Sequence, residues 1–132
     1  RACMKLSQIY DILFALCSHD LEQVVSIFPY IAWSYENGLY SILYNKNSIQ
    51  VLFYGFTTVD KAKKVVEKQS WIEFARCLSD RLVDGEVMIV IFAGGKIDKY
   101  GFSIFKKLLK ELKVKGILFY KRKIDKYIYM EV

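Results

Sequence analysis

The feature that most constrains the fold is an almost purely apolar run from Val87 to Ala93. A strand with apolar side chains on both sides is suited to the middle of a sheet that is covered on both faces. Gly94 and Gly95 end the run, and a helix from about Gly101 to Lys113 follows, with an apolar stripe on one side and lysines on the other. The sequence therefore predicts a central strand, a loop and an amphipathic helix that packs across the sheet.

The rest of the chain predicts further helices and strands around this unit. We expect helices at 6–17 and 20–28, a hairpin of strands at 39–44 and 49–56, helices beginning near Thr57 and Ser70, a helix stop at Gly116, and closing strands at 117–120 and 127–130. Pro29 should end the second helix, while Thr57 with Asp60 and Ser70 with Glu73 have the spacing of helix caps. This order predicts an α/β (α+β) fold with a mixed sheet.

The length of 132 residues predicts one domain, from Met4 to Val132. We interpret residues 1–3 as a vector remnant in front of the natural start at Met4. A hydrophobic fraction of 54%, with one Pro and 7 Gly, excludes collagen-like, proline-rich and ordinary disordered classes. The chain is therefore expected to fold around a real core.

Cysteine use and hydropathy indicate a cytoplasmic protein. No apolar run approaches the roughly 18 to 20 residues that a membrane-spanning helix needs. The three cysteines are too few and too scattered for a disulfide framework, and no His/Cys cluster has metal-ligand spacing. We therefore expect neither a transmembrane segment nor a metal site.

Positive charge is concentrated near the end of the chain. Between Lys96 and Lys126 there are 11 basic and three acidic residues, a net charge of +8, whereas the whole chain carries +6. Such asymmetry indicates an acidic partner, although a solvated lysine face is the simpler interpretation. Nucleic acid is the weaker candidate, because the aromatic residues mostly occupy core-type positions in strands. A homodimer is left open.

The loop after the central strand is the best candidate binding site. Its small residues would let a ligand approach the backbone, unpaired N–H groups at the start of a helix attract anions, and lysines add positive charge. Many loops between a strand and a helix carry two glycines for geometric reasons alone. The candidate binding residues are Ala93, Gly94, Gly95, Lys96, Lys99, Gly101 and Ser103.

The order of elements resembles the N-acetyltransferase (GNAT) fold, in which a central strand, a glycine-rich loop and a helix hold pyrophosphate and pantetheine. A closer resemblance, from about Ile12 to Tyr120, is to the RTX toxin-activating lysine acyltransferases, a divergent GNAT-like group. Residues 13–19 are similar to the family's helix ending in Ser and the catalytic His, and residues 27–31 to its Leu-Pro-Ala-Ile segment. The hairpin at 39–56 and the basic pair at 106–107 also resemble family segments.

The resemblance implies a GNAT-like mixed β-sheet flanked by helices and an acyltransferase activity. The acyl donor would be the phosphopantetheine of an acidic acyl carrier protein, or acyl-CoA, and the acceptor a lysine of another protein. His19 would be the catalytic residue. It is the only histidine, and an imidazole titrates near neutrality, as a general base for a lysine requires.

Two departures from the family pattern bear on activity. Val90 stands where the family has a second catalytic residue, an Asp in the central strand, and Asp98 replaces a Gln or Arg in the loop. Asp84 and Glu86 are, with Asp98, the nearest replacements for the acid. The alternative function is a catalytically inactive GNAT-like binding protein, of phage or mobile-element type, that engages a protein, a nucleotide or a nucleic acid.

Overall fold

The computed structural model describes Ser7 and residues 21–45, 48–95 and 98–132. These ranges contain helices α2 (Leu21–Glu36), α3 (Val59–Lys68), α4 (Trp71–Ser79) and α5 (Lys99–Leu112), strands β1 (Tyr40–Asn45), β2 (Ser48–Thr57), β3 (Val87–Gly95), β4 (Gly116–Lys121) and β5 (Lys126–Glu131), and a short 3-10 helix at Arg122–Ile124. The fold is α+β, as predicted. The predicted helix at 6–17 lies, apart from Ser7, outside the described residues.

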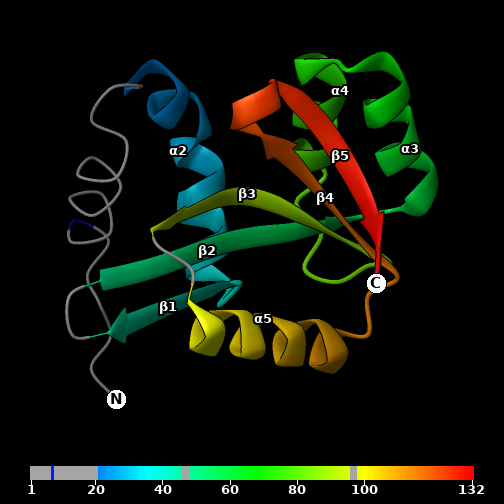
Figure 1. Ribbon diagram of the computed structural model, residues 1–132. Coiled ribbons are helices and arrows are strands. Elements are labelled where there is room, and N and C mark those ends of the chain that lie inside the picture. The colour runs from blue at the N-terminus through cyan, green and yellow to red at the C-terminus, as the bar shows by residue number, and fades with distance from the viewer. Residues whose placement is uncertain (1–6, 8–20, 46–47, 96–97) are drawn as a thin grey trace.

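The five strands form one sheet in the order β1-β2-β3-β4-β5, with β3 in the middle (Figure 1). Strands β3 and β4 are parallel, and the other neighbouring pairs are antiparallel. The predicted hairpin is confirmed, since β1 and β2 are antiparallel neighbours whose register ends with Asn45 paired to Ser48. The central place predicted for the run from Val87 to Ala93 is confirmed as well.

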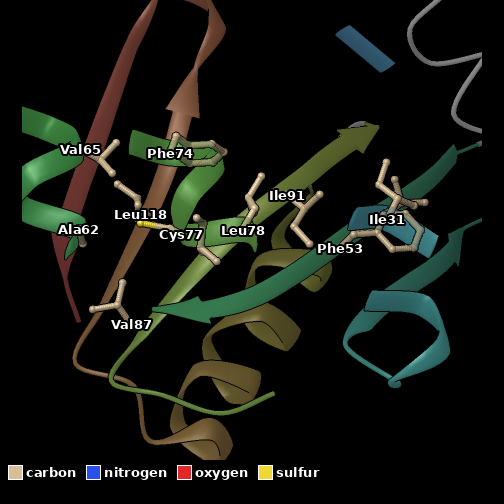
Figure 2. Packing of buried hydrophobic residues seen from close by; sticks show 12 residues of the cluster. Ile31, Phe53, Ala62, Val65, Phe74, Cys77, Leu78, Val87, Ile91 and Leu118 are labelled. Atoms are coloured by element: carbon tan, nitrogen blue, oxygen red, sulfur yellow. The ribbon is translucent and has the colours of Figure 1, made fainter. Parts of the chain in front are cut away.

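Helices cover both faces of the sheet, as a central apolar strand requires. Helices α2, α3 and α4 pack on one face, here called the α2–α4 face, and α5 packs on the other, the α5 face (Figure 1). On the α2–α4 face the core includes Ile31, Phe53, Val65, Phe74, Val87, Ile91 and Leu118 (Figure 2). On the α5 face it includes Tyr54, Met88, Leu109, Val114 and Ile117.

Helix α2 runs through Pro29, so the prediction that it ends before this proline was wrong. A proline inside a helix loses one backbone hydrogen bond and costs about 3 kcal/mol or more. The turns after Pro29 carry Ile31 and Ser34, which are completely buried, and Ser34 Oγ donates a hydrogen bond to the Ile31 carbonyl oxygen. Burial of this second half against the sheet outweighs the local preference for a break.

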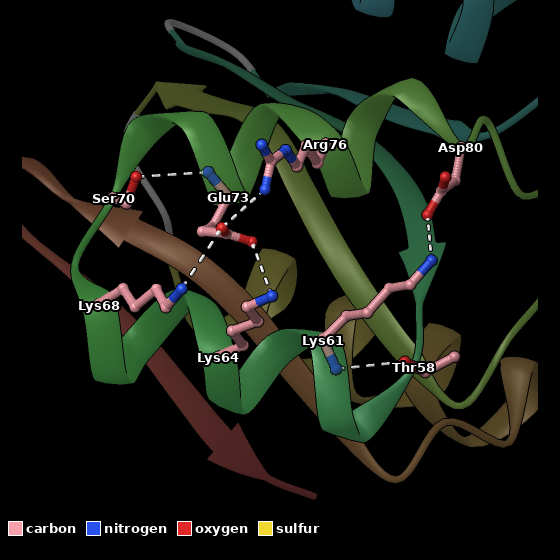
Figure 3. Close-up of polar contacts among 8 residues, drawn as sticks. All are labelled: Thr58, Lys61, Lys64, Lys68, Ser70, Glu73, Arg76 and Asp80. Atoms are coloured by element: carbon pink, nitrogen blue, oxygen red, sulfur yellow. Dashed lines mark hydrogen bonds and ion pairs between the residues drawn. The ribbon is translucent and has the colours of Figure 1, made fainter.

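The two predicted caps had different outcomes. The N-cap of α3 is Thr58 and not Thr57, because Thr58 Oγ1 accepts a hydrogen bond from the Lys61 N–H at 3.2 Å (Figure 3). Thr57 is instead the buried last residue of β2. The cap at Ser70 is confirmed, since its Oγ accepts a hydrogen bond from the Glu73 N–H at 3.4 Å.

The side chain of Glu73 joins α3 to α4. Its carboxylate lies 2.9 Å from Arg76 Nη1, 3.8 Å from Lys64 Nζ and 3.9 Å from Lys68 Nζ (Figure 3). The Glu73 side chain is only 12% exposed, which reduces the screening of these ion pairs by solvent. The lysines on this side of α3 therefore have a structural partner within the chain.

Helix α5 and its neighbours follow the predicted order, with a correction at Gly116. The helix ends at Leu112, and Lys113 takes a left-handed conformation as its C-cap. Gly116 is the first residue of β4 and not the helix stop. A side chain there would place its Cβ 2.5 Å from the ring of Tyr129, so the glycine permits close pairing of β4 with β5.

Candidate functional site

A cavity of about 1130 Å³ lies where β3 and β4 separate. The two parallel strands pair only through Val87 with Gly116, Met88 with Ile117 and Ile89 with Leu118. Beyond these pairs the strands diverge (Figure 1). Residues from both faces of the sheet line the cavity, so the opening between the strands connects the two faces.

An irregularity in β3 lies at the start of this opening. Phe53 of β2 pairs with Phe92, but its neighbour Tyr54 pairs with Val90, so Ile91 is an extra residue without a partner in the β2–β3 register. Such a bulge bends a strand and leaves one residue out of the ladder. Val90 consequently packs in the core of the α5 face, whereas Ile91 and Phe92 both pack in the core of the α2–α4 face.

The cavity has two chemically different branches. The α5 branch, on the α5 face, is apolar and is lined by Leu52, Val90, Phe105, Leu108, Ile117 and Phe119. The aromatic branch, on the α2–α4 face, is lined by Trp71 and Phe74 of α4, Tyr120 and Tyr127 of the closing strands, and Gln69. The aromatic rings touch in sequence, with centroids 5.9 Å apart for Trp71–Phe74, 5.0 Å for Phe74–Tyr127 and 5.2 Å for Tyr120–Tyr127.

The structure brings part of the predicted binding loop to the cavity. Ala93, Gly94, Gly95 and Gly101 line it. Lys99 and Ser103 are exposed and are not among the described lining residues. Lys96 and the predicted catalytic residue His19 lie outside the described part of the chain.

The start of α5 is less open to an anion than the sequence predicted. Asp98 caps the helix, and its Oδ1 accepts a hydrogen bond from the Gly101 N–H at 2.7 Å and from Gln50 Nε2 at 3.4 Å. The space beside Gly101 is filled by Gln50, whose Oε1 would lie 1.9 Å from an added Cβ. Gly101 is therefore required for contact between α5 and β2, and its N–H already has an anionic partner.

The other acids that could replace the missing family Asp lie elsewhere. Asp84 and Glu86 are exposed in the turn before β3, and Glu86 pairs with Lys115 at 3.4 Å. Among the described residues the acidic side chain that lines the cavity is Asp125, at the tip of the β4–β5 hairpin. It accepts a hydrogen bond from the Tyr120 hydroxyl, which raises the pKa of that tyrosine.

Sequence reasoning missed the aromatic branch. The sequence signal for this branch was the group of tyrosines in the two closing strands. Tyr127 and Tyr129 are two residues apart, and Tyr120 ends the preceding predicted strand. Period-two spacing places Tyr127 and Tyr129 on one face of a strand. The contacts of Tyr127 with α4 required the tertiary structure, and its burial raises the pKa of the hydroxyl.

Two cationic side chains lie at or beside the cavity. Lys106 of α5 lies 4.7 Å from the ring centroid of Phe102, which lines the cavity and is half exposed. Arg122, from the turn between β4 and β5, also lines the cavity. The basic segment predicted from the sequence thus contributes Arg122 to the described lining and Lys106 beside a lining residue.

The described ranges hold neither a candidate membrane span nor a candidate metal site. Helices in this part of the chain are too short or too polar to cross a membrane. Within the same ranges no three His, Cys, Asp or Glu side chains cluster in a way that could hold a metal ion.

Comparisons of the chain with protein-family models, with curated proteins and with solved structures each found no match.

Proposed function

We propose that this protein is an acyltransferase of GNAT-like type, which moves an acyl group from a pantetheine thioester to a lysine of another protein. The observation that carries the proposal is the separation of β3 from β4 around a cavity lined from both faces of the sheet. A thioester entering from one face and an amine from the other can meet at the end of β3. Proximity of this kind lowers the barrier to acyl transfer.

In addition to this opening, the reaction needs groups that stabilise the oxyanion and a general base. The lysine nitrogen attacks the thioester carbonyl, the C–S bond breaks, and the thiol leaves with a proton. Backbone N–H groups at the bulge in β3 are suited to stabilising the oxyanion, and Ile91 is the residue without a partner in the β2–β3 register there. We assign the role of general base to His19, and this assignment rests on the resemblance to the acyltransferase family alone.

The donor that fits the charge is an acidic acyl carrier protein. Arg122 lines the cavity and Lys106 lies over the ring of the lining residue Phe102, so an acidic surface would approach the opening favourably. The Asp98 carboxylate at the start of α5 disfavours a second anion at the Gly101 N–H. This favours a carrier-bound pantetheine over the pyrophosphate of CoA at that position.

The second candidate is a binding protein without catalysis. Val90 occupies the strand position of the family's acid, and its neighbours in the core of the α5 face are apolar side chains such as Leu52 and Leu108. An acid that could orient an imidazole is therefore missing from that strand position. The same cavity would then bind an acyl group or another ligand without turning it over.

Transfer of a radiolabelled acyl group from acyl carrier protein to a lysine-bearing acceptor tests the proposal. We expect transfer by the wild type and a loss of about 10²- to 10⁴-fold in His19→Ala, with unchanged circular dichroism. Lys63→Ala is the control and should retain full activity, because it changes an exposed α3 side chain that is not among the cavity-lining residues. Val90→Asp should increase transfer if the acid is what the chain lacks.

Two outcomes would change the proposal. Wild-type transfer that survives His19→Ala would remove His19 from the mechanism. No transfer by the wild type or Val90→Asp, with carrier protein or CoA as donor, would leave the binding protein as the better interpretation.

A further inference from the structure

The tip of the β4–β5 hairpin, residues 121–126, is a concentrated patch of positive charge. Its exposed cationic side chains are Lys121, Arg122, Lys123 and Lys126. The acid among these six residues is Asp125, so the net charge of the tip is +3. The Asp125 carboxylate already accepts a hydrogen bond from the Tyr120 hydroxyl. The tip therefore presents more positive charge than its own acid can neutralise.

This charge is unfavourable for the chain on its own. Lys121 and Lys126 are directly opposite each other in the β4–β5 register, and like charges in such a pair repel. In the described ranges, Lys121, Lys123 and Lys126 form no ion pair with an acidic side chain. Lysines of α3, by contrast, lie beside Glu73 or Asp80. A negatively charged partner would relieve the repulsion, so the tip has the electrostatics of a binding surface.

Apolar side chains protrude at the same end of the molecule. Ile124 is the aliphatic residue of the tip and is 51% exposed, and Trp71 and Ile72 at the start of α4 are 45% and 63% exposed. Figure 1 shows α4 beside the hairpin tip, and two hydrogen bonds from the Gln69 side chain to the Tyr127 backbone join the two segments. Exposed aliphatic and indole groups beside lysines are typical of a surface that enters the interface of a membrane.

Three kinds of anionic partner can be compared for this surface. Ile72 and Ile124 offer no flat face on which a base could stack, which disfavours single-stranded nucleic acid. Lysine, which supplies three of the four cations, is depleted in protein interfaces. A bilayer with anionic head groups suits both kinds of side chain, because lysines reach the head groups while aliphatic side chains enter below them. A second copy of the chain is disfavoured, since it would bring two equal positive charges together.

We infer that the hairpin tip and the start of α4 bind the surface of an anionic lipid bilayer. The cations of the tip bind the lipid head groups, and Ile124, Trp71 and Ile72 enter the head-group layer. Because Trp71 and Arg122 also line the cavity, its aromatic branch faces the membrane in this arrangement. The inference goes beyond the proposed function and does not depend on it, since no acyl transfer is involved.

Cosedimentation of the full chain with lipid vesicles tests the inference. We expect binding to vesicles with about two phosphatidylcholine molecules for each phosphatidylserine, weaker binding to pure phosphatidylcholine, and release by salt. The double variant Lys121→Gln, Lys123→Gln should bind about 25-fold more weakly, at about fivefold for each cation. Ile124→Ser should bind about tenfold more weakly, because it removes the aliphatic group that enters the bilayer.

Each variant has a matched control elsewhere on the surface. The double variant Lys107→Gln, Lys110→Gln removes two exposed lysines from α5, and Val83→Ser replaces an aliphatic side chain that is 53% exposed before β3. Both controls should retain most of the affinity for anionic vesicles, because they leave the tip and the start of α4 unchanged. Thermal unfolding of each variant confirms that it is folded.

Tryptophan fluorescence gives a second measurement and reports on this end of the molecule. Anionic vesicles should shift the emission of the wild type to shorter wavelength, and the shift should be lost in Trp71→Phe, which retains Trp33. Absence of binding to anionic vesicles at low salt, or equal losses in the tip variants and their controls, would overturn the inference. Binding of DNA or of acyl carrier protein that requires Lys121 and Lys123, without vesicle binding, would overturn it in favour of that partner.

Discussion

At the scale of single residues, Cys77 shows how burial changes the chemistry of a side chain. It lies on α4 with only 3% of its surface exposed and packs in the core of the α2–α4 face. Burial raises the pKa of its thiol, because the thiolate would lose its hydration. Such a cysteine acts as a small apolar core residue and not as a nucleophile.

The thiol of Cys77 should make stability depend on alkaline pH. Because its pKa is raised in the folded state, the folded protein holds this proton after the unfolded chain has lost it. The resulting stabilisation is present below the unfolded value, about 8.5, and is lost as the pH rises through the folded value. Cys77→Ala removes a buried side-chain atom and should be less stable than the wild type at pH 7, by about 1 kcal/mol. Because the variant lacks the thiol, it should lose less stability than the wild type on going to alkaline pH.

Urea unfolding in the presence of a reductant, at a series of pH values, measures this difference. The tyrosines whose pKa values are also raised, Tyr54, Tyr120 and Tyr127, are common to both proteins and cancel in the comparison. Parallel curves for the wild type and the variant would show that the thiol does not contribute.

At the scale of elements, the start of α5 is determined by its cap. Asp98 satisfies the Gly101 N–H, and the absence of a side chain at Gly101 leaves room for Gln50 of β2. Asp98 and Gly101, three residues apart, thus set both where the helix begins and how closely it approaches the sheet. The same aspartate occupies the helix end that the sequence predicted as an anion site.

Replacing the cap should destabilise the protein measurably. Asp98→Ala is expected to lower the free energy of unfolding by about 1 kcal/mol, because the Gly101 N–H loses its acceptor. Asp98→Asn keeps an acceptor oxygen and should cost less. Asp60→Ala is the control, since Asp60 lies in the first turn of α3 but the cap there is Thr58. Equal unfolding midpoints in urea for Asp98→Ala and Asp60→Ala would contradict this account.

At the scale of the whole molecule, the β4–β5 hairpin is joined to the rest of the sheet over a short distance. Only the first half of β4 pairs with β3. Beyond it, the side chain of Gln69 binds the backbone of Tyr127, donating from Nε2 to its carbonyl oxygen and accepting from its N–H, both at 2.9 Å. Phe74 packs on the Tyr127 ring. These contacts hold the hairpin at the side of the cavity.

Shortening this side chain should loosen the outer half of the hairpin. Gln69 has a left-handed backbone (φ 48°), a conformation that Asn also tolerates, so Gln69→Asn preserves the helix end while losing the reach to Tyr127. Two hydrogen bonds of about 1 kcal/mol each correspond to roughly tenfold or greater acceleration of amide exchange. Hydrogen exchange should rise at 126–128 and stay unchanged at 87–89 in β3. Unchanged exchange at 126–128 would show that the aromatic contacts alone hold the hairpin.

The sequence by itself determined most of the elements of this protein. The apolar run from Val87 to Ala93 predicted the central strand, the stripe after Gly101 predicted α5, and the Ser70 cap predicted the start of α4. These features could be predicted because side-chain periodicity and helix capping depend on residues only a few positions apart. The glycine-rich end of β3 was also predicted to be part of a site, and it lines the cavity.

The tertiary structure alone decided where that site opens and what lines it. Helix α2 continues through Pro29 because residues beyond it are buried by the sheet, and Gly116 begins a strand because Tyr129 lies against it. The opening exists because β4 pairs with β3 over only part of its length. The position of the hairpin beside the opening depends on the contact of Gln69 with Tyr127, which are 58 residues apart. Contacts between residues so distant in the chain leave no local sequence pattern. The side-chain periodicity around each partner reflects only the helix or strand in which it lies.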